Sequence, residues 1–167
     1  MCQPLDEGDV TNESPRWLTE TEEQAWRGLL RVFEQLVTRT GRPLQSLFGL
    51  SAADYTVLAE LTRVPEGRLR VLELGKVVGW ERSRVSHHVA RMSKRGLVER
   101  QGCAYDRRGV YVSVTPLGRR AIEEAAPRHV EDVRGLFLDH LTAAQIALLA
   151  EVSDELADSL AQTPEVA

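Results

Sequence analysis

Five cationic side chains lie within fourteen consecutive residues of a chain whose formal net charge is −4. They belong to the run RSRVSHHVARMSKR, which begins at Arg82 and ends at Arg95. An α-helix advances by about 100° per residue, so a helix over this run has one face that we expect to be buried. That face consists of Val85, His88, Val89 and Met92. The opposite and flanking faces carry Arg82, Ser83, Arg84, Ser86, His87, Arg91 and Lys94.

These outward residues have the chemistry of a surface that contacts a polyanion. Arginine and lysine neutralise phosphates, whereas hydroxyl, imidazole and guanidinium groups read base edges. Small side chains near the start of the helix let its backbone approach a groove floor closely. A merely solvated helix mixes Glu and Lys at i,i+4 spacing, but Glu81 is the single acid here. We therefore predict that these seven outward residues bind DNA.

Charge is segregated along the chain. The segment from Arg68 to Arg108 holds 11 basic and four acidic residues, a local charge of +7, and the rest of the chain carries −11. This distribution favours one face made for a polyanion and other faces that are kept away from it.

The elements around the basic run match a helix-turn-helix. Leu72 to Met92 has small Gly75 where two helices cross, Gly79 in the turn and an apolar core position at Val85. One departure is His88, which occupies a position that is usually apolar. A neutral histidine with a hydrogen-bonded ring is favoured there over a metal ligand or a pH sensor. Adjacent His87 points 100° away from it on the helix, so the two are a poor pair of ligands for one metal.

Hydrophobic periodicity, together with capping and turn residues, predicts the remaining elements. Helices are predicted over about 19–40 (ended by Gly41-Arg42-Pro43), 51–62 and 71–78, and strands at 68–70 (very short), 97–100 and 110–114. A further helix is predicted from Pro116 to about His140, bent or interrupted near Pro127, and a last helix is capped by Thr142.

The terminal helices carry apolar stripes that the small middle of the chain cannot cover. Ile146, Leu149, Val152, Leu156 and Leu160 form the stripe of the last helix. We expect dimerisation helices at 16–45 and 118–162, a DNA-binding domain at 46–117 and a disordered tail at 1–15. The alternative is that the terminal helices fold back into an ordinary core.

The segment after the basic helix carries the resemblance to a known family. Asp106-Arg107-Arg108-Gly109-Val110-Tyr111-Val112-Ser113-Val114-Thr115 resembles the D-x-R-x-x-x-x-x-L-T wing signature of the MarR (multiple antibiotic resistance regulator) family, with Val114 in place of leucine. Gly96-Leu97-Val98 and Thr115-Pro116-Leu117-Gly118 match the family pattern as well. The similarity covers about residues 19–160 and is sharpest from 69 to 118.

The resemblance implies a mainly α fold with a small β-hairpin wing: a winged helix-turn-helix with interlocking N- and C-terminal dimerisation helices. The resemblance further implies a homodimeric transcription regulator, with a repressor that binds an inverted repeat of double-stranded DNA as the expected function. Each recognition helix enters a major groove. The wing follows the minor groove, with Arg108 and Arg107 inserted or on phosphate, and Asp106 orients an arginine.

The resemblance also implies a small ligand. Many relatives bind small aromatic or phenolic compounds between their dimerisation and DNA-binding parts. Trp17 and Trp26 are placed to line such a cleft, and a place in the dimer core is at least as good an account of them. No cofactor or metal is expected.

Other classes of protein fit less well. No Gly-rich phosphate loop, H-E-x-x-H, C-x-x-C or G-x-S-x-G motif is present, so we predict no enzyme activity and no catalytic residue. A non-specific architectural DNA-binding protein should be positively charged and needs no acidic dimer arms. Redox control is the remaining alternative: Cys103 lies beside the wing, whereas Cys2 lies too far before the first helix to match the cysteine that some MarR-like regulators use. Two distant cysteines, and no stretch of 18 apolar residues, favour a cytoplasmic protein with no membrane span.

Overall fold

The computed structural model describes residues 15–103 and 106–162, without the side chains of residue 103 and residues 106–109. The chain falls into two compact units, Met1–Glu34 and Gln35–Ala167. The first helix crosses the boundary between the two units, and the site described below lies within the second.

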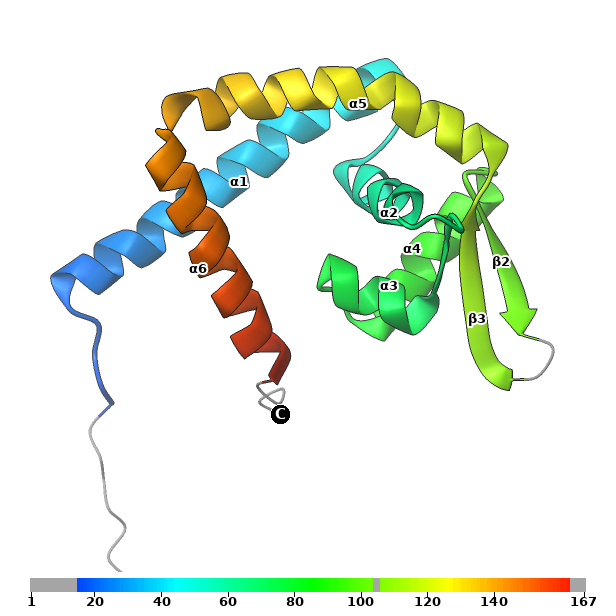
Figure 1. Cartoon of the computed structure of the whole chain (residues 1–167), viewed down its shortest axis with the longest axis horizontal. Coiled ribbons are helices and arrows are strands. Elements are labelled where there is room, and N and C mark those ends of the chain that lie inside the picture. The colour runs from blue at the N-terminus through cyan, green and yellow to red at the C-terminus, as the bar shows by residue number, and fades with distance from the viewer. Residues whose placement is uncertain (1–14, 104–105, 163–167) are drawn as a thin grey trace, which may run out of the picture. The chain divides into compact units, whose positions relative to one another are not determined.

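Figure 1 shows a predominantly helical chain with one small sheet. Its elements are α1 (Glu20–Phe48), α2 (Ala52–Arg63), β1 (Arg68–Arg70), α3 (Val71–Val78), α4 (Arg82–Lys94), β2 (Val98–Cys103), β3 (Asp106–Val114), α5 (Pro116–Leu136), the 3-10 helix η1 (Leu138–His140) and α6 (Ala143–Gln162).

The predicted end of the first helix at Gly41-Arg42-Pro43 is wrong, because α1 continues through Pro43 to Phe48. A proline inside a helix removes one hydrogen bond and costs about 3 kcal/mol. Burial of Leu44 and Thr40 in this part of α1 offsets that cost. The helix ends where Gly49 adopts φ +64°, the left-handed conformation that suits a residue just past a helix. Core packing therefore carries α1 past Pro43, and Gly49 marks its end.

The next elements confirm the predicted boundaries closely. Ser51 caps α2, since its side chain accepts from the Asp54 N–H while the Asp54 carboxylate accepts from the Ser51 N–H. This reciprocal pair satisfies two backbone donors that a helix start otherwise leaves open. Gly79 and Gly96 follow α3 and α4 in the left-handed conformation. Capping residues that can be recognised in the sequence therefore mark the boundaries of these helices.

Three antiparallel strands form the sheet, in the order β1-β3-β2. Arg70 pairs with Tyr111 across β1 and β3, and Arg100 pairs with Val112 across β2 and β3. The two long strands extend further toward the wing tip than the sequence predicted, since β2 runs to Cys103 and β3 starts at Asp106. The mainly α winged helix-turn-helix fold is confirmed.

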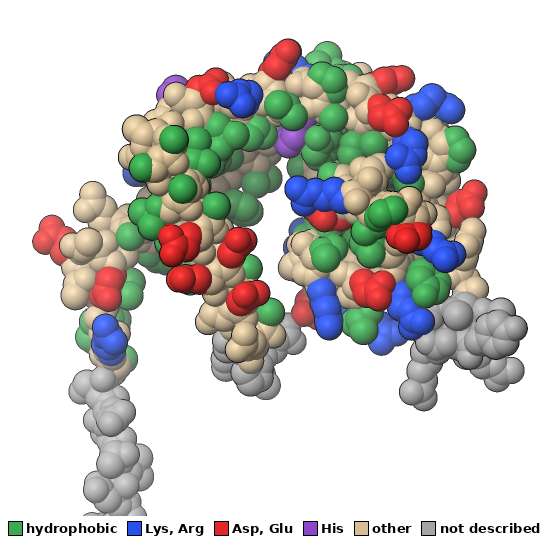
Figure 2. All heavy atoms as spheres, viewed as in Figure 1, with side chains coloured by type: hydrophobic (Ala, Val, Ile, Leu, Met, Phe, Trp, Pro, Cys, Tyr) green, Lys and Arg blue, Asp and Glu red, His purple; other side chains and the backbone are tan. Residues whose placement is uncertain are grey.

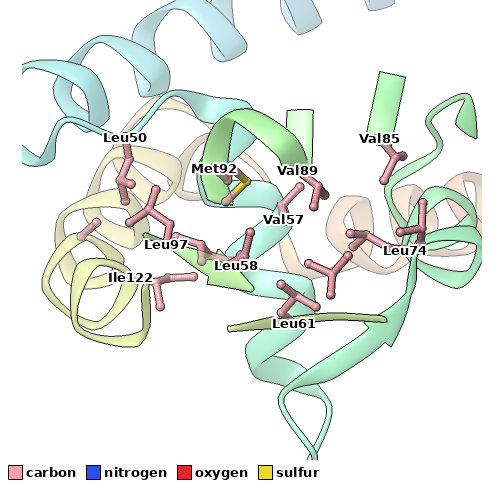
Figure 3. Packing of buried hydrophobic residues seen from close by; sticks show 14 of the residues in the cluster. Leu50, Val57, Leu58, Leu61, Leu74, Val85, Val89, Met92, Leu97 and Ile122 are labelled. Atoms are coloured by element: carbon pink, nitrogen blue, oxygen red, sulfur yellow. The ribbon is translucent and has the colours of Figure 1, made fainter. Parts of the chain in front are cut away.

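The hydrophobic core joins the end of α1, α2, α3, α4, the sheet and the first half of α5. Figure 3 shows Leu58, Leu97 and Ile122 near one another on one side of this core, and Val85 near Leu74 on the other. The predicted inward face of α4 is confirmed, because Val85, His88, Val89 and Met92 are all buried. One face of α4 is therefore buried in the core, and the opposite face is exposed.

The helices at the two ends of the chain expose their apolar side chains. The predicted stripe of α6 is fully outside the core, and α6 has no buried residue. Large exposed hydrophobic residues also lie on α1, among them Leu29, Leu30 and Phe33. Among the described residues, no single helix has the length and apolarity to cross a bilayer. The helices Pro116–His140 and Ala143–Gln162, which are bent by 107° relative to each other, meet the two criteria only when they are taken together. By length and composition alone, one such bent pair is weak evidence for a membrane span.

Candidate nucleic-acid interface

The exposed face of α4 gathers the predicted DNA contacts that the structure describes. Arg82, Ser83, Arg84, His87, Arg91 and Lys94 are exposed, and Ser86 is half-buried. The Ser86 hydroxyl donates to the carbonyl of Arg82 at 2.8 Å, so its oxygen keeps free acceptor capacity. No acid lies in the first turn of α4. The helix therefore presents hydroxyl, imidazole and guanidinium groups together, without a carboxylate among them.

A tight turn fixes α4 against α3. The Trp80 N–H donates to the Gly75 carbonyl at 2.9 Å, and a Cβ atom at Gly75 would lie 3.0 Å from the Trp80 carbonyl oxygen. A side chain at Gly75 would push the turn outward, so the predicted need for a small residue at this crossing is confirmed. Two side chains pack against the ring of Trp80. The Arg84 guanidinium lies 4.4 Å from the ring centroid, and the His88 ring contacts it edge-on at a centroid distance of 5.4 Å.

A buried carboxylate links α4 to the start of α2. Asp54 is only 3% exposed. Its carboxylate accepts from the Ser51 N–H at 2.9 Å and from Arg95 Nη1 at 2.6 Å, and it lies 3.1 Å from His88 Nε2. Burial alone raises the pKa of Asp54, but these bonds outweigh burial and hold the pKa well below its usual value. Asp54 is therefore ionised in the folded protein.

The same network reaches the exposed surface at both ends. Arg91 Nη2 lies 2.9 Å from His88 Nδ1, and Arg95 also donates to the Gly49 carbonyl beyond α1. An open cleft of about 510 Å³ is lined by Gln45, Gly49, Ser51, Asp54, His88, Arg91 and Arg95. Sequence reasoning found the basic run but missed the roles of Asp54, Arg95 and Trp80. The S-x-x-D spacing of Ser51 and Asp54 is the one local signal that pointed to Asp54.

The wing residues Asp106, Arg107 and Arg108 lie outside the residues whose side chains the structure describes. The sheet at the base of the wing carries further cations. Arg68 and Arg70 each place a guanidinium 5.3 Å from the Tyr111 ring centroid, and Arg70 Nε donates to the Tyr111 hydroxyl at 3.1 Å. These contacts hold two more cations beside the helix-turn-helix.

The two predicted ligand-binding tryptophans are exposed in the single chain. Trp17 is 81% exposed and Trp26 is 53% exposed, and neither is among the residues that line the two described clefts. The second cleft, of about 250 Å³, lies between α2 and α5 and is lined by Tyr55, Ala59, Thr62, Arg119, Ile122, Glu123 and Ala126. The Tyr55 ring packs 4.2 Å from that of His129. Burial raises the pKa of Tyr55 and lowers that of His129.

Charges differ between the parts of the chain. Figure 2 shows carboxylates grouped along α6, as the acidic flanks of the sequence predict.

Among the described residues, no three His, Cys, Asp or Glu side chains gather where they could hold a metal ion. Cys2 lies outside the described residues, as does the side chain of Cys103.

Comparison with known proteins identifies the relatives of this arrangement. The sequence pattern of the MarR family matches residues 48–109. AbsC, a MarR family transcriptional regulator of Streptomyces coelicolor, is 35% identical over 89% of this chain and 100% of its own, with a TM-score of 0.82. A second such regulator from S. coelicolor, solved in complex with DNA, is 37% identical over 93% of this chain and 96% of its own, with a TM-score of 0.84.

A more distant structure shares the fold alone. BpsR of Bordetella bronchiseptica, whose DNA binding is regulated by 6-hydroxynicotinic acid, is 23% identical over 80% of this chain and 98% of its own, with a TM-score of 0.70.

Proposed function

Because the chain belongs to the MarR family of transcriptional regulators, we propose that it is a sequence-specific repressor. In this proposal a homodimer binds an inverted-repeat operator and leaves it when a small aromatic or phenolic anion binds. Proteins of this family are transcription regulators and not enzymes. The observation that carries the proposal is the exposed face of α4, where cations and base-reading side chains lie together on a helix fixed by its opposite face.

The proposed DNA contacts divide by chemistry. Ser86 and His87 lie between the cations of α4 and are assigned to base edges, whereas Arg82, Arg84, Arg91 and Lys94 are assigned to phosphates or to guanine. Ser83, small and exposed near the start of α4, allows close approach of the backbone. Replacement of Ser86 or His87 by alanine should change the preferred bases, at a cost of about 1–3 kcal/mol for each lost base contact.

The proposed wing contacts come from the family pattern. Arg108, with Arg107, is assigned to the minor groove or to phosphate. Asp106 is assigned to orienting an arginine, since a carboxylate facing DNA alone would be repelled.

A homodimer supplies two copies of α4 to one operator. The exposed apolar side chains of α1, α5 and α6 support dimerisation, because a large apolar surface is costly to leave in water. Two recognition helices reach adjacent major grooves when their centres are about 34–36 Å apart. An operator of about 16–20 base pairs, with half-sites one turn apart, therefore fits the proposal.

Selection from random-sequence duplexes tests DNA recognition directly. The full chain should enrich an inverted repeat, and footprinting should show protection of both half-sites. A promoter that carries the enriched site should be silenced by the protein. Enrichment of no sequence favours the alternative of a non-specific architectural protein, and increased transcription makes the protein an activator.

The proposed inducer is a small aromatic or phenolic anion. Trp17 and Trp26 remain the proposed contacts in the dimer, and the cleft between α2 and α5 offers a second place, with the Arg119 cation and the Tyr55 hydroxyl. The regulation of BpsR by 6-hydroxynicotinic acid supports this ligand class for the fold. A ligand can release DNA only if it binds the competent and incompetent dimers with different affinity. A near-complete switch requires about 5.5 kcal/mol of such difference.

Titration of tryptophan fluorescence with salicylate, alongside gel shifts, tests the inducer. Salicylate should change the fluorescence and weaken operator binding over the same concentration range. Arg119→Ala and Trp26→Phe should separate the two proposed places, because each removes binding at one of them. If no such compound changes either signal at millimolar concentration, redox control becomes the leading account of regulation.

A further inference from the structure

Asp54 and His88 form a buried titratable pair between α2 and α4. They are 3% and 6% exposed, and Asp54 Oδ1 lies 3.1 Å from His88 Nε2. Neither residue belongs to the proposed DNA-contacting surface. Buried charged and polar groups cost free energy unless they are paired. The pair sits directly beneath the cations of α4, so its orientation bears on how those cations are presented.

The contacts of His88 define which of its nitrogens carries the proton. Arginine is only a hydrogen-bond donor, so the 2.9 Å contact from Arg91 Nη2 requires His88 Nδ1 to accept. In a neutral imidazole the other nitrogen then carries the hydrogen. That nitrogen, Nε2, faces the Asp54 carboxylate, without a well-aligned hydrogen bond. A carboxylate next to one ring nitrogen is a common way to fix the tautomer of a histidine.

A second line of contacts leads from His88 to Arg84. The ring of His88 packs edge-on against the ring of Trp80, with the two centroids 5.4 Å apart. The Arg84 guanidinium lies over the Trp80 ring, 4.4 Å from its centroid. Contact of a guanidinium with an indole face is attractive, because the ring face is electron-rich. Of the two cations that flank the outward face of α4, Arg91 therefore contacts His88 directly, and Arg84 is linked to His88 through Trp80.

We propose that Asp54 and His88 are positioning residues for DNA recognition. The neutral His88 ring, oriented by Asp54, fixes Arg91 directly and Arg84 through Trp80, so that α4 presents both arginines in one orientation. This inference rests on the proposed function and deepens it, because it states what makes the cations of α4 selective for sequence.

The charges that face His88 determine what protonation does. Asp54 faces it from α2, and Arg91 and Arg95 face it from α4. The cleft's other lining residues, Gln45, Gly49 and Ser51, have no titratable side chain. A protonated ring still attracts Asp54, but its Nδ1–H becomes a donor that faces the donor of Arg91. Protonation therefore releases Arg91 and adds positive charge beneath α4.

Loss of selectivity without loss of general affinity is the expected signature. Extra positive charge does not weaken phosphate contacts, so binding to any duplex should persist. Sequence discrimination should fall, because a released arginine no longer meets a base or phosphate in one geometry. The ratio of operator affinity to scrambled-duplex affinity is therefore the informative quantity.

The experiment measures that ratio for the full-length protein against pH at constant ionic strength. The probes are the duplex enriched from a random pool and its scrambled counterpart, and the His88 ring is followed by NMR. The ratio should fall about tenfold over the pH interval in which the His88 resonance titrates, the loss expected for one charge-assisted hydrogen bond.

Three variants complete the test. His88→Gln is neutral at every pH and should show no fall over that interval. Arg91→Ala, which changes an exposed side chain and should leave the fold intact, should have a low ratio that is independent of pH. His140→Gln is the matched control, since His140 is an exposed histidine in η1, and it should behave as the wild type.

Several results would overturn the inference. The ratio could stay constant while His88 titrates, it could fall while the His88 ring stays neutral, or the fall could persist in Arg91→Ala. Abolition of the fall by His140→Gln would assign it to another group and overturn the inference as well. A wild-type protein that prefers no duplex at any pH would instead overturn the proposed function together with the inference.

Discussion

At the scale of single residues, Asp54 shows how one carboxylate connects distant parts of the chain. It caps the start of α2 through Ser51 and receives Arg95 from the end of α4. Arg95 and His88 lie 41 and 34 positions along the sequence from it, so no local pattern in the sequence could have revealed the cluster. The spacing of Ser51 and Asp54 is typical of a helix start, but it gives no indication of the long-range partners of Asp54.

Acid should unfold the protein partly through Asp54. Its pKa is lower in the folded state than the ordinary value of 3.8, so its stabilisation is fully present above pH 3.8 and is lost as the pH falls below it. We expect the free energy of unfolding to decrease from about pH 4 downward. Urea titrations should show a smaller decrease in Asp54→Asn, with Glu66→Gln as an exposed control. If the free energy of unfolding of Asp54→Asn decreased in acid as much as that of the wild type, the decrease would come from other carboxyl groups.

The same substitution should cost stability at neutral pH. Removal of one partner of a buried ion pair costs about 3–5 kcal/mol. The Arg95 side chain is 45% exposed, and water screens its interaction with Asp54. We therefore expect the cost to lie near or below the lower end of that range.

Arg108 tests the wing. If its side chain lies on phosphate, Arg108→Ala should weaken binding to all duplexes about equally and reduce the slope of log affinity against log salt by about one unit. Affinity titrations at several salt concentrations measure both effects. An unchanged affinity would remove Arg108 from the interface, and a change confined to one base position would make it a base-reading residue.

At the scale of elements, capping residues and periodicity defined most of the helix-turn-helix. Ser51, Gly79, Gly96 and Thr115 mark boundaries that the structure confirms. The predictions failed where packing overrides local preference. Pro43 lies inside α1, where the next residue, Leu44, is buried in the core. The pairing of β1 with β3 also could not be deduced, since register between strands more than forty residues apart depends on the whole fold.

The junction between α4, the sheet and α5 depends on a residue without a side chain. A Cβ atom at Gly118 would collide with the Leu97 carbonyl oxygen, because the start of α5 packs closely against the segment after α4. We expect Gly118→Ala to lower the free energy of unfolding by about 1–3 kcal/mol. Gly41→Ala is the matched control, since its new Cβ would meet Ala52 at an ordinary 3.5 Å. Equal stability of the two variants in urea titrations would contradict this packing.

At the scale of the whole molecule, the proposed recognition of an inverted repeat requires a second copy of the chain. The apolar side chains of α1, α5 and α6 are exposed in one chain, and dimers of this kind often have no stable folded monomer. Sedimentation at low micromolar concentration should show a dimer. Leu149→Glu, on the exposed stripe of α6, should shift the protein toward unfolded or aggregated monomer. A well-folded monomer of the wild type would rule out the dimeric architecture.

In the proposed function, this dimer reads DNA sequence through the outward face of α4. The most direct measurement is an anisotropy titration of the enriched inverted repeat and its scrambled counterpart at the same salt concentration. The inverted repeat should bind at least about 10³-fold more tightly than the scrambled duplex, with one dimer per duplex. Equal affinity for the two duplexes would contradict the proposed function.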